Sequence, residues 1–467
     1  MNETKGNNAE KQQVSSRQRS YMGLTKAGGD LLGVMFTGAL LTFYVDILGM
    51  DPELFGIVMI IFAVWNAIND PVFGYISDKK SLDSKGKRLY FIRLAAPIFL
   101  VGFLMFWIAF PSWSNVSLFI FLLIALFIFD TGLTIYGLNL SAILTGQTTS
   151  TNERTRISII TSVISFLPVG IAAILPNLVL TSEMAIVYMR LIFIGMTVIA
   201  AILMLIGTMK MKEHSLRKEK VEPLPVWPAI KETFKSKAFI FFVIINFMFT
   251  AISTNLVGVM PLYFKYIAQL NQWQILAVSA PIGILQIPFY FLYGYLQRKL
   301  GLRNSVFIII GVMLVGFLGL FFQTHIVVNA ISYALCLLMI SFWFVIVNPL
   351  VGDIADEDEL KTGRRREGMF FGINALITKP ASSLVVFFFT LIISHFGYDS
   401  DLAVQTAQAQ FGIILGLSIL SLAFIVLAIV PLIIYPLHGS KLKEIKQELD
   451  IRHEKKQEEE NEEKNYL

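Results

Sequence analysis

Four charged side chains stand inside long apolar stretches of this 467-residue chain. They are Asp30, Asp70, Asp130 and Lys379. A charge at the depth of a bilayer is costly, so such residues often mark the path of a solute, an ion or a proton. A buried carboxylate can change its charge state there, because burial raises its pKa and a nearby cation lowers it again. The alternative for each of the four is a structural hydrogen bond or ion pair.

Sequence spacing places further groups beside these charges. Asn66 lies one turn before Asp70 and shares its helix face, because positions i and i+4 point the same way. A glycine further along the same stretch permits close helix approach, and an acid at its basic end can pair with arginines elsewhere. We expect a gate formed by Gly74, Asp78, Arg364, Arg365 and Arg366. A loop with the usual basic bias is the structural alternative.

Three other charges fall near the ends of apolar stretches. They are Asp46, Arg190 and Lys265. Long side chains at such positions can reach the membrane surface while their stems remain in lipid. We therefore interpret these three charges as structural.

The elements that must position these residues are membrane-spanning helices. The chain is 55% hydrophobic and 15% charged, with 39 Phe, whereas soluble globular proteins carry roughly 25% charged residues. A helix needs about 20 apolar residues to cross a bilayer. This criterion predicts twelve spans, at about 25–49, 54–77, 92–110, 116–146, 156–180, 186–210, 238–265, 272–297, 303–323, 327–352, 367–396 and 405–436.

The connections between these spans alternate in charge. Five are rich in Lys and Arg, including the stretches 79–93 and 361–366, and the six between them have neither residue. Basic loops remain on the cytoplasmic side of a membrane. The pattern therefore predicts a multi-pass protein of the plasma membrane with both termini in the cytoplasm.

The chain divides at its longest polar interruption. We expect a cytoplasmic segment at 1–22, six-helix bundles at 23–210 and 238–438, a cytoplasmic loop at 211–237 and a solvated charged tail at 439–467. FGYISDKK (73–80) and YGYLQRKL (293–300) hold the same place in the two halves. This match favours a repeat of six helices.

The sequence lacks the motifs of several classes of protein. Cys336 is the single cysteine, the five His are scattered, and no phosphate-binding loop or nucleophile motif is present. The net charge of +5 resides in short clusters between spans rather than on one face. The sequence thus predicts no enzyme activity, no cofactor, no resident metal and no nucleic-acid partner.

At these residues the chain resembles the glycoside–pentoside–hexuronide:cation symporters of the major facilitator superfamily, a family typified by melibiose permease. The first half carries FYVDILGM (43–50), WNAINDPVFGYISDKK (65–80) and TSTNERTRIS (149–158). The second half carries GDIADEDELKTGRRREGMFFGINALITKP (352–380) and HFGYD (395–399). The resemblance covers nearly all of residues 20–440 and implies an all-α major facilitator fold.

The resemblance also assigns roles to individual positions. It implies that Asp30 binds a sugar, that Lys379 lies near the sugar and cation sites, and that Asp70 belongs to the cation site. The family has two cation-site acids on its second helix, and the first of these falls on Asn66 in this chain. The family's acid on the fourth helix falls on Gly137. Asp130, about 10 Å further along its helix, is a candidate replacement for that fourth-helix charge.

Other family positions bear on the solute. The fifth-helix arginine that supports sugar binding falls on Ser162, and the tenth-helix aromatic falls on Trp343 or Phe344. We expect Asn139 and Trp343 to contact substrate hydroxyls together with Asp30. Losing the arginine weakens any prediction of a galactoside.

The leading hypothesis is a monomeric symporter for a sugar or glycoside, coupled to a cation through Asn66, Asp70 and Asp130. The missing acids favour H⁺ over Na⁺, with Asp70 as the position for any transported Na⁺. Two alternatives remain open. One is a carrier of lysolipids or other amphipathic solutes, and the other is a membrane scaffold or sensor that transports nothing.

Overall fold

A computed structural model describes residues 14–81, 87–147, 151–213, 231, 233–322, 325–363, 367–449 and 451–452. The regular elements of these residues are helices. Twelve of the helices in the described ranges are long and apolar enough to cross a membrane. The prediction of an all-α protein with twelve spans is therefore confirmed.

The first six spans follow one another with short connections. They are α2 (Ser16–Thr42) with the π-helix η1 (Phe43–Ile47), α3 (Pro52–Ser81), α4 (Lys87–Ile108), α5 (Asn115–Gly146), α6 (Thr151–Leu180) and α7 (Ile186–Lys210). The last six are α9 (Lys237–Leu262) with the π-helix η2 (Tyr263–Ile267), α10 (Gln272–Leu300), α11 (Leu302–Phe322), α12 (Ile326–Thr362), α13 (Glu367–His395), and α14 (Ala407–Ile414) with η3 (Leu415–Ile419) and α15 (Leu420–Ile434).

The chain forms two compact units. Unit 1 contains 1–222, 254–277 and 383–414, and unit 2 contains 223–253, 278–382 and 415–467. Unit 1 thus holds the first six spans together with one end of α9, α10 and α13 and with α14. This grouping differs from a division into two sequential six-helix bundles, because parts of the second half pack against the first.

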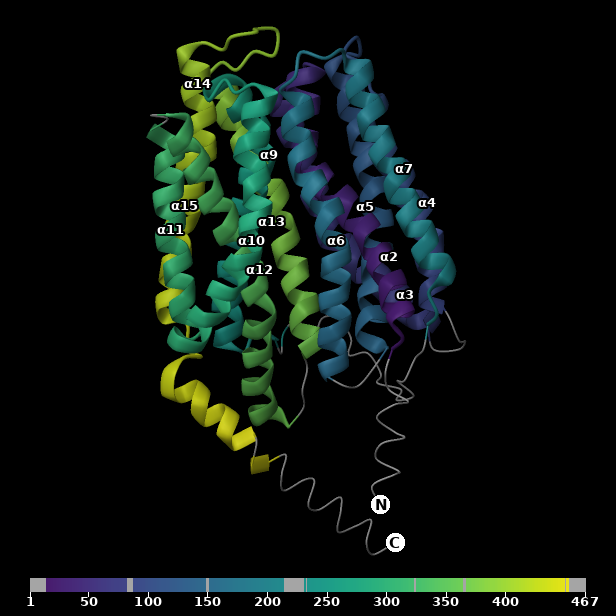
Figure 1. The fold of residues 1–467 in the computed structure, drawn as a ribbon, viewed down its shortest axis with the longest axis vertical. Helices are drawn as coiled ribbons and strands as arrows, with labels where there is room; N and C mark the ends of the chain where they lie inside the picture. Colours follow the sequence, from purple (N-terminus) through teal and green to yellow (C-terminus); the bar gives the residue numbers. More distant parts are fainter. Residues whose placement is uncertain are drawn as a thin grey trace, which may run out of the picture. The chain divides into compact units, whose positions relative to one another are not determined.

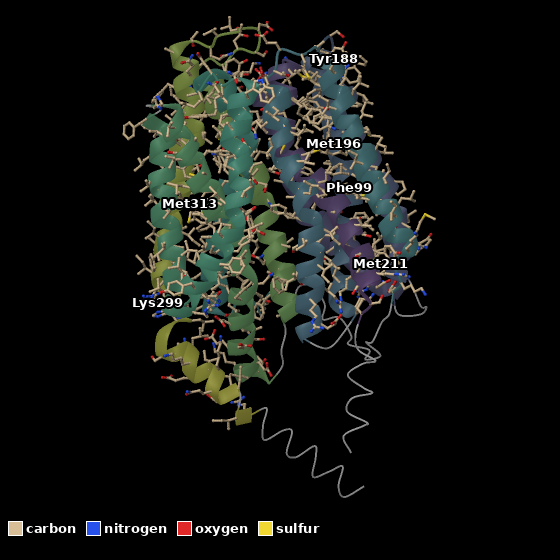
Figure 2. All side chains as sticks on the ribbon, in the orientation of Figure 1. Phe99, Tyr188, Met196, Met211, Lys299 and Met313 are labelled. Carbon is tan, nitrogen blue, oxygen red and sulfur yellow. The ribbon has the colours of Figure 1, made fainter. Side chains whose placement is uncertain are left out.

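Small residues allow the helices of unit 1 to pack closely. Within this unit α2 lies against α6 and α7, and α4 lies against α5 (Figure 1). A methyl group at Gly207 of α7 would overlap the backbone of Thr25 in α2. Tyr188 and Met211 mark the two ends of α7, and Phe99 lies in the interior of the unit (Figure 2). Such glycine contacts are typical of helix association in lipid.

Two helices extend by nine or ten residues beyond their predicted ends. α2 begins at Ser16 rather than near residue 25, and α12 continues ten residues past 352 to Thr362. The Ser15 hydroxyl caps α2 by accepting from the Gln18 N–H. Gly363, with φ +69°, ends α12 in the left-handed conformation that glycine tolerates best. These caps are local signals that hydropathy does not register.

Part of the tail predicted from residue 439 is helical. Residues 439–449 form a helix (Figure 1, yellow). Ile445 and Leu449 are buried, and Lys446 pairs with Asp353 of α12 at 2.9 Å. Four residues separate Ile445 from Leu449, so both lie on one face of the helix. Apolar burial and ion pairing together order a segment whose charge alone suggested a solvated chain.

Candidate functional site

A buried polar cluster joins α3 to α5 in unit 1. It consists of Asn66, Asn69, Asp70, Asp130 and Thr134. The Asn66 amide, in the orientation that satisfies its hydrogen bonds, donates to both Asp130 oxygens at 2.9 and 3.0 Å. The Asn69 amide donates to Asp130 and, at 3.2 Å, to the Thr134 hydroxyl. That hydroxyl donates to Asp70 Oδ1 at 2.9 Å.

The structure thus brings together the three residues predicted for cation coupling. Asn66 and Asp130 are buried and Asp70 is half-buried. The amide N–H groups of Asn66 and Asn69 donate to the Asp130 carboxylate. Asn69 Oδ1 is buried without a hydrogen-bond partner. The cluster therefore combines two acids with a free acceptor oxygen.

Sequence reasoning had missed Asn69 and Thr134. Asn69 stands within the Asn-Asp-Pro run, next to Asp70, and Thr134 lies one turn from Asp130 on α5. Both spacings were readable in the sequence. That α3 and α5 turn these faces toward one another depends on how the helices pack, which no single helix specifies.

Asp30 lies on α2 in the same unit. Lys26, one turn earlier, pairs with the Asp30 carboxylate, and sequence reasoning had overlooked this lysine. The two side chains are 33% and 32% exposed. The ring of Tyr136 lies against Gly29, and its hydroxyl donates to the Thr25 carbonyl at 2.6 Å. A charged pair with this exposure in a spanning helix calls for a polar environment rather than lipid.

The other predicted solute residues lie in different surroundings. Asn139 is buried in unit 1, and its amide donates to the Ile135 carbonyl of its own helix at 2.8 Å. Trp343 is fully buried in unit 2, where its Nε1 donates to Asn246 Oδ1 at 2.9 Å. Asn246 in turn donates to Asn374 of α13 at 2.9 Å. Trp343 also stacks on Phe249 with ring centroids 4.2 Å apart.

The remaining predicted residues are described less completely. Lys379 is half-buried on α13 in unit 2, five residues after the buried Asn374. Gly74 and Asp78 belong to α3, but their side chains lie outside the described part of the structure. The arginine cluster lies wholly outside the described residues, at Arg364, Arg365 and Arg366. The predicted gate thus remains a prediction.

A second charged cluster gathers where α2 ends. We call it the Asp46 cluster: Asp46 of η1, Lys265 and Tyr266 of η2, and Tyr398 after α13. Lys265 Nζ lies 2.7 Å from Asp46 Oδ2. The hydroxyls of Tyr266 and Tyr398 both donate to Asp46 Oδ1, the latter at 2.6 Å. The Asp46 side chain is 0% exposed and that of Lys265 28% exposed.

The Asp46 cluster corrects the expectation that these charges reach for the membrane surface. Asp46 turns inward because Lys265 and the hydroxyls of two tyrosines bind its carboxylate there, so it does not need to reach the polar membrane surface. Arg190 also points to protein, since it donates to the Ala109 carbonyl and lies 4.7 Å from the centre of the Phe110 ring. The missed signal was the opposite charge of Asp46 and Lys265, which lie on the segments that end the first span of each half.

A third set of charges ties the tail helix to α12 within unit 2. Glu357 of α12 pairs with Lys361 at 2.8 Å and with Lys441 at 3.7 Å. Asp353, one turn earlier, pairs with Lys446. Both acids are buried, so the tail lysines supply charges that these carboxylates need.

The chain is similar to several known transporters. It is 21% identical to the sodium-dependent lysophosphatidylcholine symporter 1 of Xenopus tropicalis, over 88% of this chain and 85% of the relative. It is 22% identical to the uncharacterized symporter YjmB of Bacillus subtilis, over 80% of this chain and 82% of the relative.

Solved structures share the same fold. One is a bacterial homologue of the human lysosomal transporter Spinster in an inward-facing, unoccupied conformation, with a TM-score of 0.64, 14% identity and coverage of 90% of this chain and 97% of that one. The D-xylose–proton symporter superimposes with a TM-score of 0.60, 13% identity and coverage of 87% and 96%.

A family model covers almost the whole membrane region. It is described as MFS/sugar transport protein and matches residues 21–439. Twelve apolar helices and an intramembrane cluster of carboxylates agree with a carrier rather than an enzyme. The chain belongs to the MFS/sugar transport protein family of membrane transporters.

Proposed function

We propose that this protein is a symporter that moves a sugar or glycoside together with a proton. The observation that carries the proposal is the cluster in which Thr134 links Asp70 to the Asn69 amide, which also donates to Asp130. Two charged carboxylates in one hydrogen-bonded cluster between membrane helices repel one another, and their charge is costly in low dielectric. Uptake of one proton relieves both effects.

Asp70 is the proton acceptor in this proposal. Asp130 accepts amide N–H groups from two asparagines, an environment that suits a permanent charge. Asp70 is more exposed than Asp130 and accepts from a hydroxyl that can turn around. When Asp70 binds a proton, its own O–H becomes a donor and the Thr134 hydroxyl can reorient to accept it.

In this proposal, polar side chains outside the cluster bind the solute. Asp30, paired with Lys26 through Oδ2, has its other carboxylate oxygen to offer to sugar hydroxyls. Lys379 supplies donors on α13, and Asn246 and Asn374 hold Trp343 in a fixed orientation. Alternating access carries the solute between the two sides. The basic loops and both termini face the cytoplasm of the plasma membrane, and the working unit is a monomer.

The test begins with a thermal-shift screen of sugars and glycosides, because a ligand that binds the native state raises its apparent stability. The hit is then followed in proteoliposomes with an imposed proton gradient. Asp70→Asn should abolish accumulation against a gradient while solute exchange continues. Gradient-driven accumulation at the parent level in Asp70→Asn would remove Asp70 from coupling, and absence of flux for every solute would favour a scaffold.

Sodium coupling is a second candidate that one observation favours. Asn69 Oδ1 is an unused acceptor beside two carboxylates, and hard cations prefer such oxygen ligands. A sodium gradient at constant pH should then drive uptake, and Asn69→Ala should weaken the sodium dependence. Proton coupling predicts uptake without sodium.

A lysolipid solute is a second candidate for the cargo. The name of the Xenopus relative supports it, since that relative is a lysophosphatidylcholine symporter. Lysophosphatidylcholine should then stabilise the purified protein in the thermal-shift screen, and neutral sugars should not.

A further inference from the structure

The Asp46 cluster lies at one end of unit 1, where segments from both halves of the chain meet. α2 begins beside the end of α7, since the Gln18 side chain donates to the Lys212 carbonyl at 2.6 Å. Asp46, beyond the last residue of α2, is therefore at the opposite end of the unit. Lys265 and Tyr398 come from α9–η2 and from the loop after α13.

Helices from the two halves of the chain approach one another closely toward this end of unit 1. A methyl group at Gly38 of α2 would meet Pro176 at 3.3 Å and Val257 of α9 at 3.7 Å. A methyl group at Gly258 would lie 3.2 Å from the Thr37 carbonyl. One at Gly56 of α3 would overlap Thr390 of α13. The two halves are thus in close contact at the Asp46 end.

The two charges lie on corresponding segments of the two halves. η1 and η2 are five-residue π-helices, and each directly continues the first span of its half, with sequences FYVDI and YFKYI. π-Helical turns are rare and are frequently found at functional sites. The acid is on the first and the base on the second, so each half contributes one member of the pair.

We propose that Asp46 and Lys265, with Tyr266 and Tyr398, form a releasable seal that closes the transport path at the Asp46 end. The inference rests on the proposed alternating-access transport, since a path that opens at both ends in turn needs a contact that breaks and re-forms. The seal binds the two halves together in the state described here and separates when this end opens.

The chemistry of the cluster suits a contact that opens. A buried ion pair gains little net stability, because desolvating both charges offsets most of their attraction. When the halves part, water solvates Asp46 and Lys265 again and replaces the lost contacts. Burial, and to a lesser degree the Asp46 charge, raise the pKa of Tyr398 well above its usual range, so its hydroxyl remains a donor. The seal therefore pairs particular residues, but little net free energy is needed to separate them.

The experiment measures access to a thiol on α2, three residues after Asp30, the acid that the proposed function assigns to the solute. Gly33 of α2 has open space around its Cα and lies 13 residues before Asp46, or about 20 Å along a helix. In a Cys336→Ala background, Gly33→Cys is exposed to a membrane-impermeant maleimide in intact cells and in inverted vesicles. The thiol should react quickly from the face opposite Asp46 and slowly from the Asp46 face.

Breaking the seal should raise the labelling rate from the Asp46 face. Asp46→Asn, which keeps the shape of the side chain, should raise the labelling rate from the Asp46 face by about tenfold or more as the open state gains population. The double variant Asp46→Lys with Lys265→Asp should return the rate toward that of the parent. Tyr398→Phe, which removes one donor and keeps both charges, should give a smaller increase.

Glu53→Gln is the matched control. Glu53 is an exposed acid at the same end that accepts from Ser394 at 2.9 Å, and its loss should leave labelling unchanged. Equal labelling of the parent, Asp46→Asn and Tyr398→Phe would overturn the seal. If Asp46→Asn fails to fold, the charge-reversed double variant and Tyr398→Phe decide the question. Because labelling needs no solute, a failed seal and a failed symport proposal give different results.

Discussion

Buried carboxylates in this protein are accompanied by donors drawn from distant parts of the chain. Glu153 at the start of α6 accepts from the Val14 N–H at 3.0 Å and from two nitrogens of Arg19 at 3.0 and 2.6 Å. The Arg19 and Glu153 side chains are 11% and 5% exposed. The same pattern holds for Asp46 and Asp130, so partner chemistry, more than position along a span, determines where each acid points.

The Arg19–Glu153 pair gives a stability prediction. Glu153→Ala leaves a buried guanidinium without its partner, and breaking a buried pair in this way costs about 3–5 kcal/mol. The apparent Tm in detergent, followed by tryptophan fluorescence, should fall clearly. Glu448→Ala is the control, because the Arg452–Glu448 pair is 50% and 59% exposed and exposed pairs contribute about 0–1 kcal/mol. Similar losses in both variants would show that burial of the pair does not matter.

At the level of elements, glycines set how closely α4 and α5 approach. A methyl group at Gly132 of α5 would overlap the backbone of Phe99 in α4, and one at Gly102 would overlap Phe129 in the same way. These two contacts fix the rotation of α5. They therefore also fix the face on which Asp130 and Thr134 meet α3.

Gly132→Ala should destabilise the protein and disturb the polar cluster. Overpacking of this kind typically costs about 1–3 kcal/mol, and a loss of coupling should accompany the fall in Tm. Gly170→Ala in α6 is the matched control, since nothing lies within 4 Å of a methyl group there. Alanine is favoured over glycine inside a helix by about 0.5–1 kcal/mol, so this variant should be neutral or slightly stabilised. A Tm for Gly132→Ala equal to that of Gly170→Ala would contradict the packing argument.

At the level of the whole molecule, the charge of the loops predicts the orientation of the spans, whereas the packing of the spans defines the compact units. The basic loops follow every second span and predict orientation. The compact units instead follow contact, and unit 1 includes the ends of second-half helices that meet the Asp46 cluster. Sequence halves and packed units therefore differ wherever the halves touch.

Orientation can be tested with reporter fusions. Alkaline phosphatase, which is active only outside the cytoplasm, is fused after Ser182 in the α6–α7 connection and, separately, after Leu467. The positive-inside rule predicts activity for the first fusion and none for the second. Activity of the C-terminal fusion would reverse the proposed topology and place the Asp46 end on the cytoplasmic side.

The sequence alone determined the number of spans, the fold class and the residues to watch. Spans are legible because each must supply about 20 apolar residues and satisfy its own backbone hydrogen bonds. Periodicity placed Asn66 and Asp70 on one face, and the motifs around them pointed to a transporter. These properties belong to single helices, so they can be predicted without knowing which helices pack together.

Only the tertiary structure decided which side chains meet. That Asp130 faces Asn66 and Asn69, that Asp46 binds Lys265, and that the tail helix docks on Asp353 depend on the rotation and approach of separate helices. Those quantities follow from glycine contacts and shape across interfaces, which a one-dimensional pattern does not contain. A charge in a span predicts that a partner exists, and packing determines which residue it is.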